Sequence, residues 1–310
     1  LEDWNGMGTA WTYKSDPNDE HDAVRDAAGM FDMSPLKKVF VRGPDAQATL
    51  DHLTTRDVSK IRPGMSAYLC VLTEQGGIAD DAILSNFAGD EWMIVHGSGD
   101  TMALLEASAI GRDTEISFDD DLHDLSVQGP KSLEILNAHC DIDLSSLTYF
   151  QHAPAQLFGH PCRLARTGYS GERGYEIFAD ARYIGDVWDQ LVAAGVMPCS
   201  FTALDKVRIE AGLLFYGYDM TEDTTPWDVG LGFTVSKTKG AFRGKEAVLA
   251  AEHTPKIANV CLEIDHSDMV EGGETLSFEG RDAGVINSPC YSHRLGKSLA
   301  LAHATDAHYI

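Results

Sequence analysis

The chain contains the same short pattern twice, and this repeat limits the folds that the sequence can adopt. VFVRGPDAQATL at Val39–Leu50 and LSVQGPKSLEIL at Leu125–Leu136 each show an alternating strand pattern, a Gly-Pro pair and a helical apolar pattern. The two copies match at a constant offset, as Gly43 and Gly129 do. Proline is tolerated in a first helical turn, because its missing N–H would have no partner there. The sequence therefore predicts two strand-to-helix units and two related α+β halves.

Apolar periodicity predicts further elements between the two repeats and after them. Residues that alternate in polarity indicate strands, and apolar residues spaced three or four apart indicate helices. The expected strands are Ser66–Leu72, Ala82–Phe87 and Glu91–His96, and the expected helices are Thr101–Ile110 and Phe201–Leu214.

The apolar pattern of the sequence changes beyond Lys245. A short helix is expected at Lys245–Glu252, and short segments that alternate in polarity follow it. Gly280 and Gly284 punctuate these segments, as turn residues do in small β domains. The C-terminal part is therefore expected to be a small β-barrel or sandwich. Its expected strands are Ala258–Ile264, Glu274–Phe278, Asp282–Ile286 and Ser298–Ala302.

The charge of the chain argues against two classes of partner. Among its 310 residues, 48 are acidic and 24 are basic, which gives a formal net charge of −24. Such a charge opposes binding to nucleic acid and to an anionic membrane surface. The excess is spread along the chain, which is typical of a strongly solvated surface. Any positively charged pocket must therefore be local.

Apolar runs and cysteines narrow the class of protein further. No apolar run approaches the roughly 20 residues that span a bilayer, and no signal-peptide pattern opens the chain, so a cytoplasmic location is expected. The six cysteines are widely spaced, with no CxxC pair. We therefore expect buried thiols, and neither a metal site nor a disulfide framework.

The run RTGYSGERGYEI at Arg166–Ile177 is a first candidate for chemistry. Its glycines recur at every third residue, which suits a tight turn or the close approach of a flat ligand. Tyr169 offers a stacking face, and Glu176 enters a strand on the same side as Phe178. On local sequence alone, a hairpin with a solvated or paired glutamate is the simpler explanation.

The acidic run EQGGIADD at Glu74–Asp81 is a second candidate. Gly76 and Gly77 predict a tight turn before a strand. Because neighbouring residues on a strand face opposite sides, Asp80 and Asp81 cannot both be solvated if one face is packed. One of them is expected to enter a cavity, where a carboxylate could accept a proton or stabilise a developing cation. The alternative is that the pair caps a hairpin.

Seven blocks, in order along the chain, resemble the aminomethyltransferase family, which includes the T-protein of the glycine cleavage system and folate-dependent demethylases. The resemblance runs from about Glu20 to the C-terminal part, and seven ordered blocks are far more specific than any one of them. The blocks are EHDAVRDAAGMFDMS, GGIADD, VQGP, RTGYSGERGYEI, VRIEAGLLFYGYDM, TTPWDVGLGFTV and FRGKEAV.

The resemblance implies a fold and a cofactor. The fold would be a three-domain ring of the α+β class, with two related α+β halves and a C-terminal jelly-roll-like β-barrel. Tetrahydrofolate would lie in the central hole. We expect the folate-binding α+β region, made of two interleaved subdomains, at residues 1–240 and the barrel domain at residues 241–310.

The resemblance also implies roles for particular residues. Asp81, the second acid of the GGIADD block, would be the catalytic residue near the folate nitrogens. Glu176 would bind the pterin through the short bonds that a carboxylate makes to N–H groups. Tyr169, Tyr68 and Phe150 would form aromatic walls around the cofactor.

The chain departs from the T-protein pattern at positions expected near the pocket. Leu204 replaces an arginine that usually precedes the RLEAG-type helix, although Arg208 is retained as a cofactor contact. His96 stands where asparagine is usual, and it is either a ligand contact or a structural histidine. SPLKK at Ser34–Lys38 replaces the usual SHM. These departures indicate a donor other than the aminomethyl-lipoyl protein of glycine cleavage.

We therefore expect a tetrahydrofolate-dependent one-carbon transferase. It would move a methyl group from a small methylated donor (a betaine-like amine, a sulfonium or a methoxy compound) to tetrahydrofolate. Orientation of the methyl group toward folate N5 would supply much of the rate. Asp81 would stabilise cationic character or manage the N5 proton. A glycine cleavage T-protein, served by a lipoyl-carrier protein, is the close alternative.

Two further alternatives belong to other classes. A non-catalytic folate-binding module of the iron–sulfur assembly kind would carry a KGCYxGQE-like motif, where this chain has AGLLFYGYDM. A detached domain of a flavin-linked dimethylglycine or sarcosine oxidase would need its flavin on another chain, because no GxGxxG fingerprint occurs here.

Overall fold

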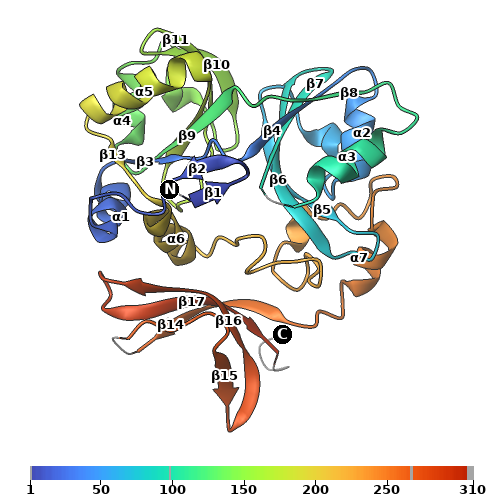
Figure 1. Ribbon diagram of the computed structural model, residues 1–310. Coiled ribbons are helices and arrows are strands. Elements are labelled where there is room, and N and C mark those ends of the chain that lie inside the picture. The colour runs from blue at the N-terminus through green and yellow to red at the C-terminus, as the bar shows by residue number, and fades with distance from the viewer. Residues whose placement is uncertain (1, 98, 266–267, 306–310) are drawn as a thin grey trace.

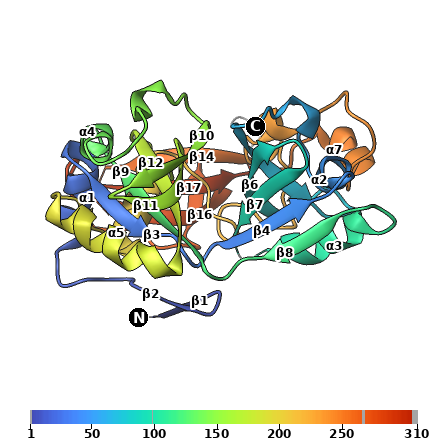
Figure 2. The ribbon, with the colours of Figure 1, turned by 90° about the horizontal axis from the view of Figure 1, so that it is seen from above.

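The computed structural model describes residues 2–97, 99–265 and 268–305, and Figure 1 shows their arrangement. Two α+β halves lie side by side, with a smaller C-terminal sheet below them in this view. Seen from above in Figure 2, the helices flank the outer sides of the two halves, and the two sheets face each other. The α+β class expected from the sequence is confirmed.

The first half is an antiparallel sheet covered by helices on its outer face. Leu50, Leu53 and Leu105 of these helices are buried in one apolar cluster with the sheet. The strands are β4 (Lys37–Arg42), β5 (Ser66–Leu72), β6 (Ile78–Ala88), β7 (Glu91–His96) and β8 (Glu115–Phe118), in the order β5-β6-β7-β4-β8. The helices are α2 (Ala46–Leu53), α3 (Thr101–Ala109) and the short 3₁₀ turn η1 (Val58–Lys60).

The second half is a six-stranded sheet that takes strands from both ends of the region. Its strands are β3 (Gly29–Asp32), β9 (Leu122–Gln128), β10 (His152–Leu157), β11 (His160–Ala165), β12 (Gly174–Asp180) and β13 (Met197–Pro198). Their order is β10-β11-β12-β9-β3-β13. The helices are α1 (Pro17–Asp26), α4 (Ser132–Asn137), η2 (Leu144–Ser146), α5 (Ala181–Ala193) and α6 (Phe201–Glu210). A hairpin of β1 (Glu2–Trp4) and β2 (Met7–Thr9) precedes them.

The two halves share one topology, which explains the repeated sequence pattern. Strands β10, β11, β12, β9 and β3 take the places that β5, β6, β7, β4 and β8 have in the first sheet, with antiparallel pairing throughout. The repeats form β4 with α2 and β9 with α4. The chain interleaves the halves, because α1 and β3 precede the first sheet in sequence but belong to the second.

The Gly-Pro pair in each repeat makes a tight turn before the helix. Helices α2 and α4 begin two residues after the proline, at Ala46 and Ser132, so the expected proline in the first helical turn is not observed. Gly43 and Gly129 have φ of 112° and 130°, where an L side chain is strained. A Cβ on Gly43 would lie 2.7 Å from the Asp113 carbonyl oxygen, so the turn requires glycine.

The C-terminal part is a four-stranded antiparallel sheet, and not the closed jelly-roll-like barrel that was expected. In the part of the chain that the structure describes, β14 and β15 remain edge strands. One face of β17 places Leu299 and Leu301 against Ile209 of α6. The other face places Ala300 and Ala302 in a cluster with Ile286 and Val270. The strands are β14 (Ala258–Ile264), β15 (Thr275–Phe278), β16 (Arg281–Ser292) and β17 (Lys297–Ala304), in the order β14-β17-β16-β15.

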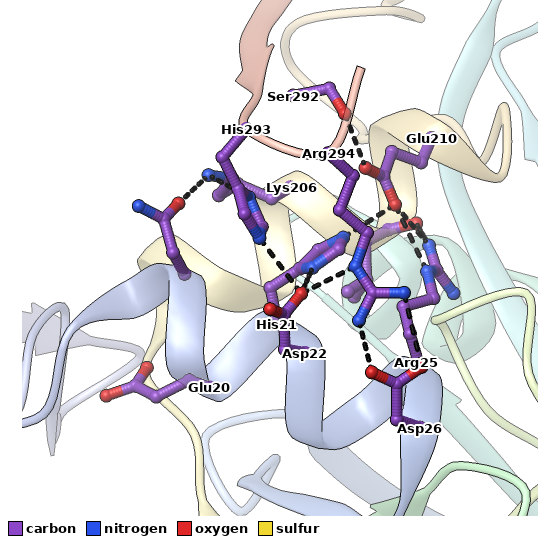
Figure 3. Close-up of polar contacts among 12 residues, drawn as sticks. Glu20, His21, Asp22, Arg25, Asp26, Lys206, Glu210, Ser292, His293 and Arg294 are labelled. Atoms are coloured by element: carbon purple, nitrogen blue, oxygen red, sulfur yellow. Dashed lines mark hydrogen bonds and ion pairs between the residues drawn. The ribbon is translucent and has the colours of Figure 1, made fainter. Parts of the chain in front are cut away.

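An ion-pair network joins α1, α6 and the β16–β17 turn of the C-terminal sheet (Figure 3). Nε2 of the buried His21 lies 2.8 Å from Glu210, which also accepts from Arg25 at 2.8 Å. Asp22 accepts from His293 at 2.9 Å and from Arg294 at 2.6 Å. The network therefore fixes the C-terminal sheet to the second half.

This network also contains a group with the spacing of metal ligands. One ligand atom from each of His21, Asp22 and His293 lies within 4.8 Å of the others. The same Asp22 oxygen already accepts from Arg294, so ion pairs satisfy the group.

The structure also bears on the expectations about cysteines and membrane-spanning segments. All six cysteines are free, but Cys261 is exposed and Cys140 half-buried, whereas buried thiols were expected. Among the described residues, none of the helices has the length and apolar character needed to cross a membrane.

Candidate functional site

The GGIADD run forms the turn into β6 and separates its two acids onto opposite faces. Asp80 is fully buried on the face of Ala82 and Leu84, which packs against the helices. Asp81 is half-buried on the other face, beside Ile83, which turns toward the second half of the molecule. The two acids are therefore not both solvated, as expected, and the expected entry of one of them into a cavity stays a prediction.

Asp81 lies in an environment that favours its protonated form. Burial and the negative charge of Asp80 raise the pKa of Asp81 to about 7, although an interaction with the Tyr68 hydroxyl lowers it. Burial and Asp81 in turn raise the pKa of Tyr68 well above its usual range. Cys70 is the register partner of Asp81, which places both Tyr68 and Asp81 on one face of the β5–β6 ladder. A carboxyl with such a pKa can both accept and release a proton at neutral pH.

His96 lies on the other side of the sheet from Asp81. Its Nδ1 is 2.9 Å from Asp80, which also accepts from the Thr101 hydroxyl at 2.7 Å. Nε2 of His96 is buried without a partner among the described residues. The structure therefore brings His96 to Asp80, and its role as a cofactor contact stays a prediction.

Glu176 occupies the middle of β12 and faces the first half of the molecule. Its register partner is Ser126 on β9, and it accepts a short hydrogen bond from the Thr167 hydroxyl. Burial raises the pKa of Glu176, while the bond from Thr167 lowers it. Tyr149 lies close enough for the charge of Glu176 to raise the pKa of that phenol, after the larger effect of burial.

Asp124 is a second buried carboxyl beside Glu176, and sequence reasoning missed it. It pairs in register with Phe178 on β12, so it lies diagonally from Glu176 on the same face. Both carboxylate oxygens of Asp124 are buried without a partner among the described residues. Burial, and then the charge of Glu176, raise the pKa of Asp124 well above its usual range, while nearby Lys38 lowers it.

Lys38 completes this group from the first half. It is 1% exposed, and its Nζ donates to the carbonyl oxygens of Ser34 at 2.6 Å and Leu36 at 2.8 Å. Burial lowers the pKa of Lys38, against the opposing effect of Asp124. In the sequence, Asp124 could have been noticed as an acidic residue directly before the alternating residues of β9. Lys38 could have been noticed because SPLKK at Ser34–Lys38 differs from the T-protein pattern.

The glycines of the RTGYSGERGYEI run have a structural role. A Cβ on Gly168 or Gly174 would lie within 2.3 Å of the buried Gln128 side chain. That side chain donates to Ser126 at 2.9 Å and accepts from Ser170 at 2.8 Å. The run therefore wraps closely around Gln128, which fixes the start of β12 and with it Glu176.

Tyr169 and Arg208 lie together next to the Asp81 cluster. The Tyr169 hydroxyl donates to the Leu214 carbonyl oxygen at 2.5 Å, and burial raises the pKa of Tyr169. Arg208 donates to Asp219 at 2.6 Å and to Ser288 of β16 at 2.9 Å. A third hydrogen bond, from Nε to Asp205 at 2.7 Å, means that each nitrogen of the Arg208 guanidinium donates to a protein group. Its role as a cofactor contact stays a prediction.

Phe150 lies in the loop between η2 and β10 of the second half. Its φ is 64°, a left-handed conformation, and its ring packs edge-on against Tyr149 with centroids 4.6 Å apart. The Phe150 carbonyl oxygen accepts from the Ser66 backbone N–H at 2.7 Å, so it adjoins the start of β5. Leu204, by contrast, is buried in the apolar cluster beneath α6 and offers no polar contact.

Two cavities of similar volume lie in the two halves of the molecule. One, of about 360 Å³, is lined by residues of the η1 to β5 region and of the turn η3 (Gly232–Thr234). The other, of about 350 Å³, lies between Phe87 of the first half and Phe178 of the second. Neither cavity is lined by Asp81 or Glu176 themselves.

Comparisons with known proteins agree along nearly the whole chain. Residues 1–239 match the profile of the GCVT N-terminal domain, and residues 258–309 match that of the glycine cleavage T-protein C-terminal barrel domain. The crystal structure of glycine cleavage system aminomethyltransferase T from Bartonella henselae superposes with a TM-score of 0.89 at 28% identity, covering 98% of this chain and 85% of that one.

Two curated relatives carry different names. The heme-dependent oxidative N-demethylase gamma subunit of Ectopseudomonas mendocina (strain ymp) is 44% identical over 317 residues, which cover 97% of this chain and 84% of the relative. An aminomethyltransferase of Streptomyces coelicolor is 34% identical over 322 residues, which cover 99% of this chain and 86% of the relative.

Proposed function

This chain belongs to the glycine cleavage T-protein family, and from that premise we propose that it is a tetrahydrofolate-dependent one-carbon transferase. The observation that carries the proposal is the pair of buried carboxyls on adjacent strands, Glu176 and Asp124. Glu176 receives one hydrogen bond in the described structure, from Thr167, and Asp124 receives none on its carboxylate. The pair therefore has acceptor capacity that the protein does not use.

Tetrahydrofolate fits this acceptor capacity. A pterin presents amino and ring N–H donors along one edge, and ionised carboxylates accept such donors in short paired bonds. Leaving buried acceptors unpaired costs free energy, so a ligand that supplies donors here is bound more tightly. We propose that Glu176, supported by Asp124, binds the pterin edge.

The cluster around Asp81 would carry the chemistry. Tetrahydrofolate, when bound, supplies the nucleophilic N5 that receives the one-carbon unit. Asp81, whose pKa is raised to about 7, would accept a proton released at the site and would offset positive charge that develops there. The Tyr68 and Tyr169 rings and the Phe150 ring would pack on the flat faces of the cofactor.

Arg208 and His96 are proposed to support the site from behind these rings. Arg208 holds Asp219 and Ser288, and so fixes α6 beside Tyr169. His96 holds Asp80, whose charge adds to the larger effect of burial in raising the pKa of Asp81. Both residues would therefore act mainly on the position and charge of their neighbours.

We propose that the donor is a small N-methylated amine. The relative named as a demethylase subunit is 44% identical, against 34% for the aminomethyltransferase. By that analogy, a partner chain with a two-electron acceptor of its own would oxidise the N-methyl group, and addition of water would release formaldehyde and the demethylated amine. This chain would then hold formaldehyde against tetrahydrofolate, and their condensation would release one water. A direct transfer from a cationic donor is the alternative: the carbon–N5 bond forms as the donor bond breaks, and its electron pair leaves with the donor.

Product analysis tests the proposal and separates its forms. Wild-type protein is incubated with tetrahydrofolate and either formaldehyde, methylated amines or sulfonium compounds, or an aminomethyl-lipoyl carrier protein. We expect 5,10-methylene-tetrahydrofolate to form faster than without protein, and to depend on Asp81. A 5-methyl product would assign direct methyl transfer, and stimulation only by the lipoyl carrier would assign the aminomethyltransferase activity. Tight folate binding without any turnover would leave a non-catalytic folate-binding module.

A further inference from the structure

The cavity of about 350 Å³ between the two halves combines aromatic walls with a guanidinium group. Phe40 of β4 and Phe87 of β6 line it from the first half, and their rings meet edge-on with centroids 5.8 Å apart. Phe178 of β12 and Arg163 of β11 line it from the second half, and they are register partners, so both side chains leave the same face of the sheet. Apolar walls with few polar groups, at this volume, are typical of small-molecule sites.

Arg163 carries a positive charge that the described structure does not neutralise. Its Nη1 donates to Nδ1 of His152 at 2.8 Å, and its guanidinium lies 3.8 Å from the centre of the Phe87 ring. Burial, and then the charge of Arg163, lower the pKa of His152 to about 4, so this imidazole is neutral at pH 7. No carboxylate among the described residues lies within ion-pair distance of Arg163, and the more distant Glu91 is paired with Arg42 at 2.8 Å.

The free edge of the Arg163 guanidinium has the geometry that a carboxylate requires. His152 takes Nη1, whereas Nε and Nη2, which share one edge, have no hydrogen-bond partner in the part of the chain that the structure describes. Arginine binds a carboxylate through two parallel N–H bonds from such an edge. Because Arg163 is half-buried, it gains more from an ion pair than a fully solvated arginine does.

A second arginine of the same cavity is already neutralised. Arg182 of α5 donates through Nε and Nη2 to the two carboxylate oxygens of Asp180, at 2.8 and 2.9 Å. Its two-bond edge is therefore occupied by the protein. Of these two arginines, only Arg163 has that edge available for a ligand.

We propose that this cavity binds a small carboxylic acid with a flat apolar body. The carboxylate would accept from Nε and Nη2 of Arg163, and the apolar body would pack among the aromatic rings of the two halves. Asp81 and Glu176 do not line the cavity, so this site is separate from the proposed folate site. The inference therefore stands or falls independently of the proposed function.

Calorimetry with phenylacetate and 2-phenylethanol on the wild-type protein tests the ligand class without any variant. Both probes have the same ring, but only phenylacetate carries a carboxylate. Phenylacetate should bind saturably, and the alcohol should bind roughly tenfold more weakly, because hydrogen bonds between charged groups are the stronger ones. Acetate, which lacks the apolar body, should also bind far more weakly than phenylacetate. Equal affinity for phenylacetate and the alcohol, or no saturable binding of phenylacetate, would overturn the inference.

Two matched variants locate the carboxylate. Arg163→Gln should weaken phenylacetate binding roughly tenfold, whereas Arg182→Gln, which removes the same charge from the same cavity, should change it by about twofold or less. Equal losses in the two variants would contradict the Arg163 contact. A loss in Arg62→Gln instead would assign the acid to the other cavity and overturn the inference.

Tetrahydrofolate separates this site from the proposed function. Saturating tetrahydrofolate should leave the affinity for phenylacetate unchanged, because the two ligands occupy different places. Competition between them would place the acid in the folate site and overturn the inference. Phenylacetate binding that persists in a protein that binds no folate would remove the proposed function and support this site.

Discussion

Asp124 and Glu176 lie diagonally across the β9–β12 ladder, and the negative charge of Glu176 raises the pKa of Asp124. Burial is the larger cause for Asp124, and both its oxygens lack a partner among the described residues. Two buried carboxyls that repel each other are costly to a folded protein on its own. They become favourable when a ligand supplies hydrogen-bond donors, which is the basis of the proposed pterin site.

Replacing Asp124 with asparagine should stabilise the free protein at neutral and higher pH. A carboxyl whose pKa is raised on folding binds more protons in the folded state, so its contribution to stability falls as pH rises through the range between the unfolded and folded values. The asparagine side chain cannot ionise, so we expect the melting temperature of Asp124→Asn at pH 8 to rise by roughly 2 °C or more. The gain should disappear at strongly acidic pH, where the wild-type carboxyl is protonated in both states.

The control for this variant is Asp282→Asn, an exposed acid of β16. It should leave the pH dependence of the melting temperature unchanged. A uniform shift of Asp124→Asn at every pH would show that the carboxyl is not titrating in this range.

Asp81→Asn should abolish turnover and keep folate affinity. Loss of a positioned base costs about 100-fold or more in kcat. Because the pKa of Asp81 is raised to about 7 and the ionised form is the base, the wild-type rate should rise with pH through that value. A pH–rate profile of the wild type and variant checks both points. Wild-type activity that falls over this range would assign Asp81 as an acid instead.

Tyr68→Phe should move the pH–rate profile to higher pH. The hydroxyl interaction of Tyr68 lowers the pKa of Asp81, so its removal raises that pKa and less Asp81 is ionised at pH 7. The plateau rate at high pH should change little, because the ring remains. Tyr218→Phe, an exposed tyrosine, serves as control and should leave the profile in place. A lower plateau without a shift would indicate a different role for the hydroxyl.

Glu210→Gln should destabilise the protein by about 2 kcal/mol at pH 7, because it breaks a largely buried network. Burial raises the pKa of Glu210, but bonds from His21 and Arg25 outweigh it and bring the value to about 2. Because the pKa of Glu210 is lowered on folding, its ionised carboxylate stabilises the folded protein at pH values above 4.5. This stabilisation is lost as the pH falls toward 2.

Urea unfolding at pH 7 and pH 3 measures this dependence. The difference between wild type and Glu210→Gln should be smaller at pH 3. Glu279→Gln, at an exposed pair 3.7 Å from Arg281, should have no effect at either pH. Equal losses for the two variants would contradict a structural role for the α1–α6 network.

The local sequence pattern predicted many helices and strands, but it did not predict how the strands of the C-terminal part are arranged. The observed β5 and β7 have the expected bounds, because each is a short and mostly apolar run. Helix α6 ends at Glu210, earlier than expected, because Gly212 adopts φ of 68° and ends the helix. A closed barrel is not observed among the described residues, although residues 258–309 match the profile of a C-terminal barrel domain. Alternation predicts strands but does not predict whether the edge strands pair with each other.

Some residues of the candidate site can be recognised from local sequence, whereas others can be recognised only from contacts between distant parts of the chain. Asp81 and Glu176 stand in short runs whose glycines and alternation can be recognised in sequence. The contacts of Arg208 with Ser288 and of His96 with Asp80 depend on how separate elements come together, so no local pattern predicts them. Asp124 is important only because its neighbour across the ladder is Glu176.

Tetrahydrofolate binding to wild type and Glu176→Gln is the most direct test of the account. The matched control is Glu134→Gln, an exposed glutamate of α4. Calorimetry should show that Glu176→Gln weakens binding by roughly 30-fold, the loss expected when a charge-assisted bond becomes a neutral one, and that Glu134→Gln binds like wild type. Unchanged affinity in Glu176→Gln would contradict the proposed pterin site.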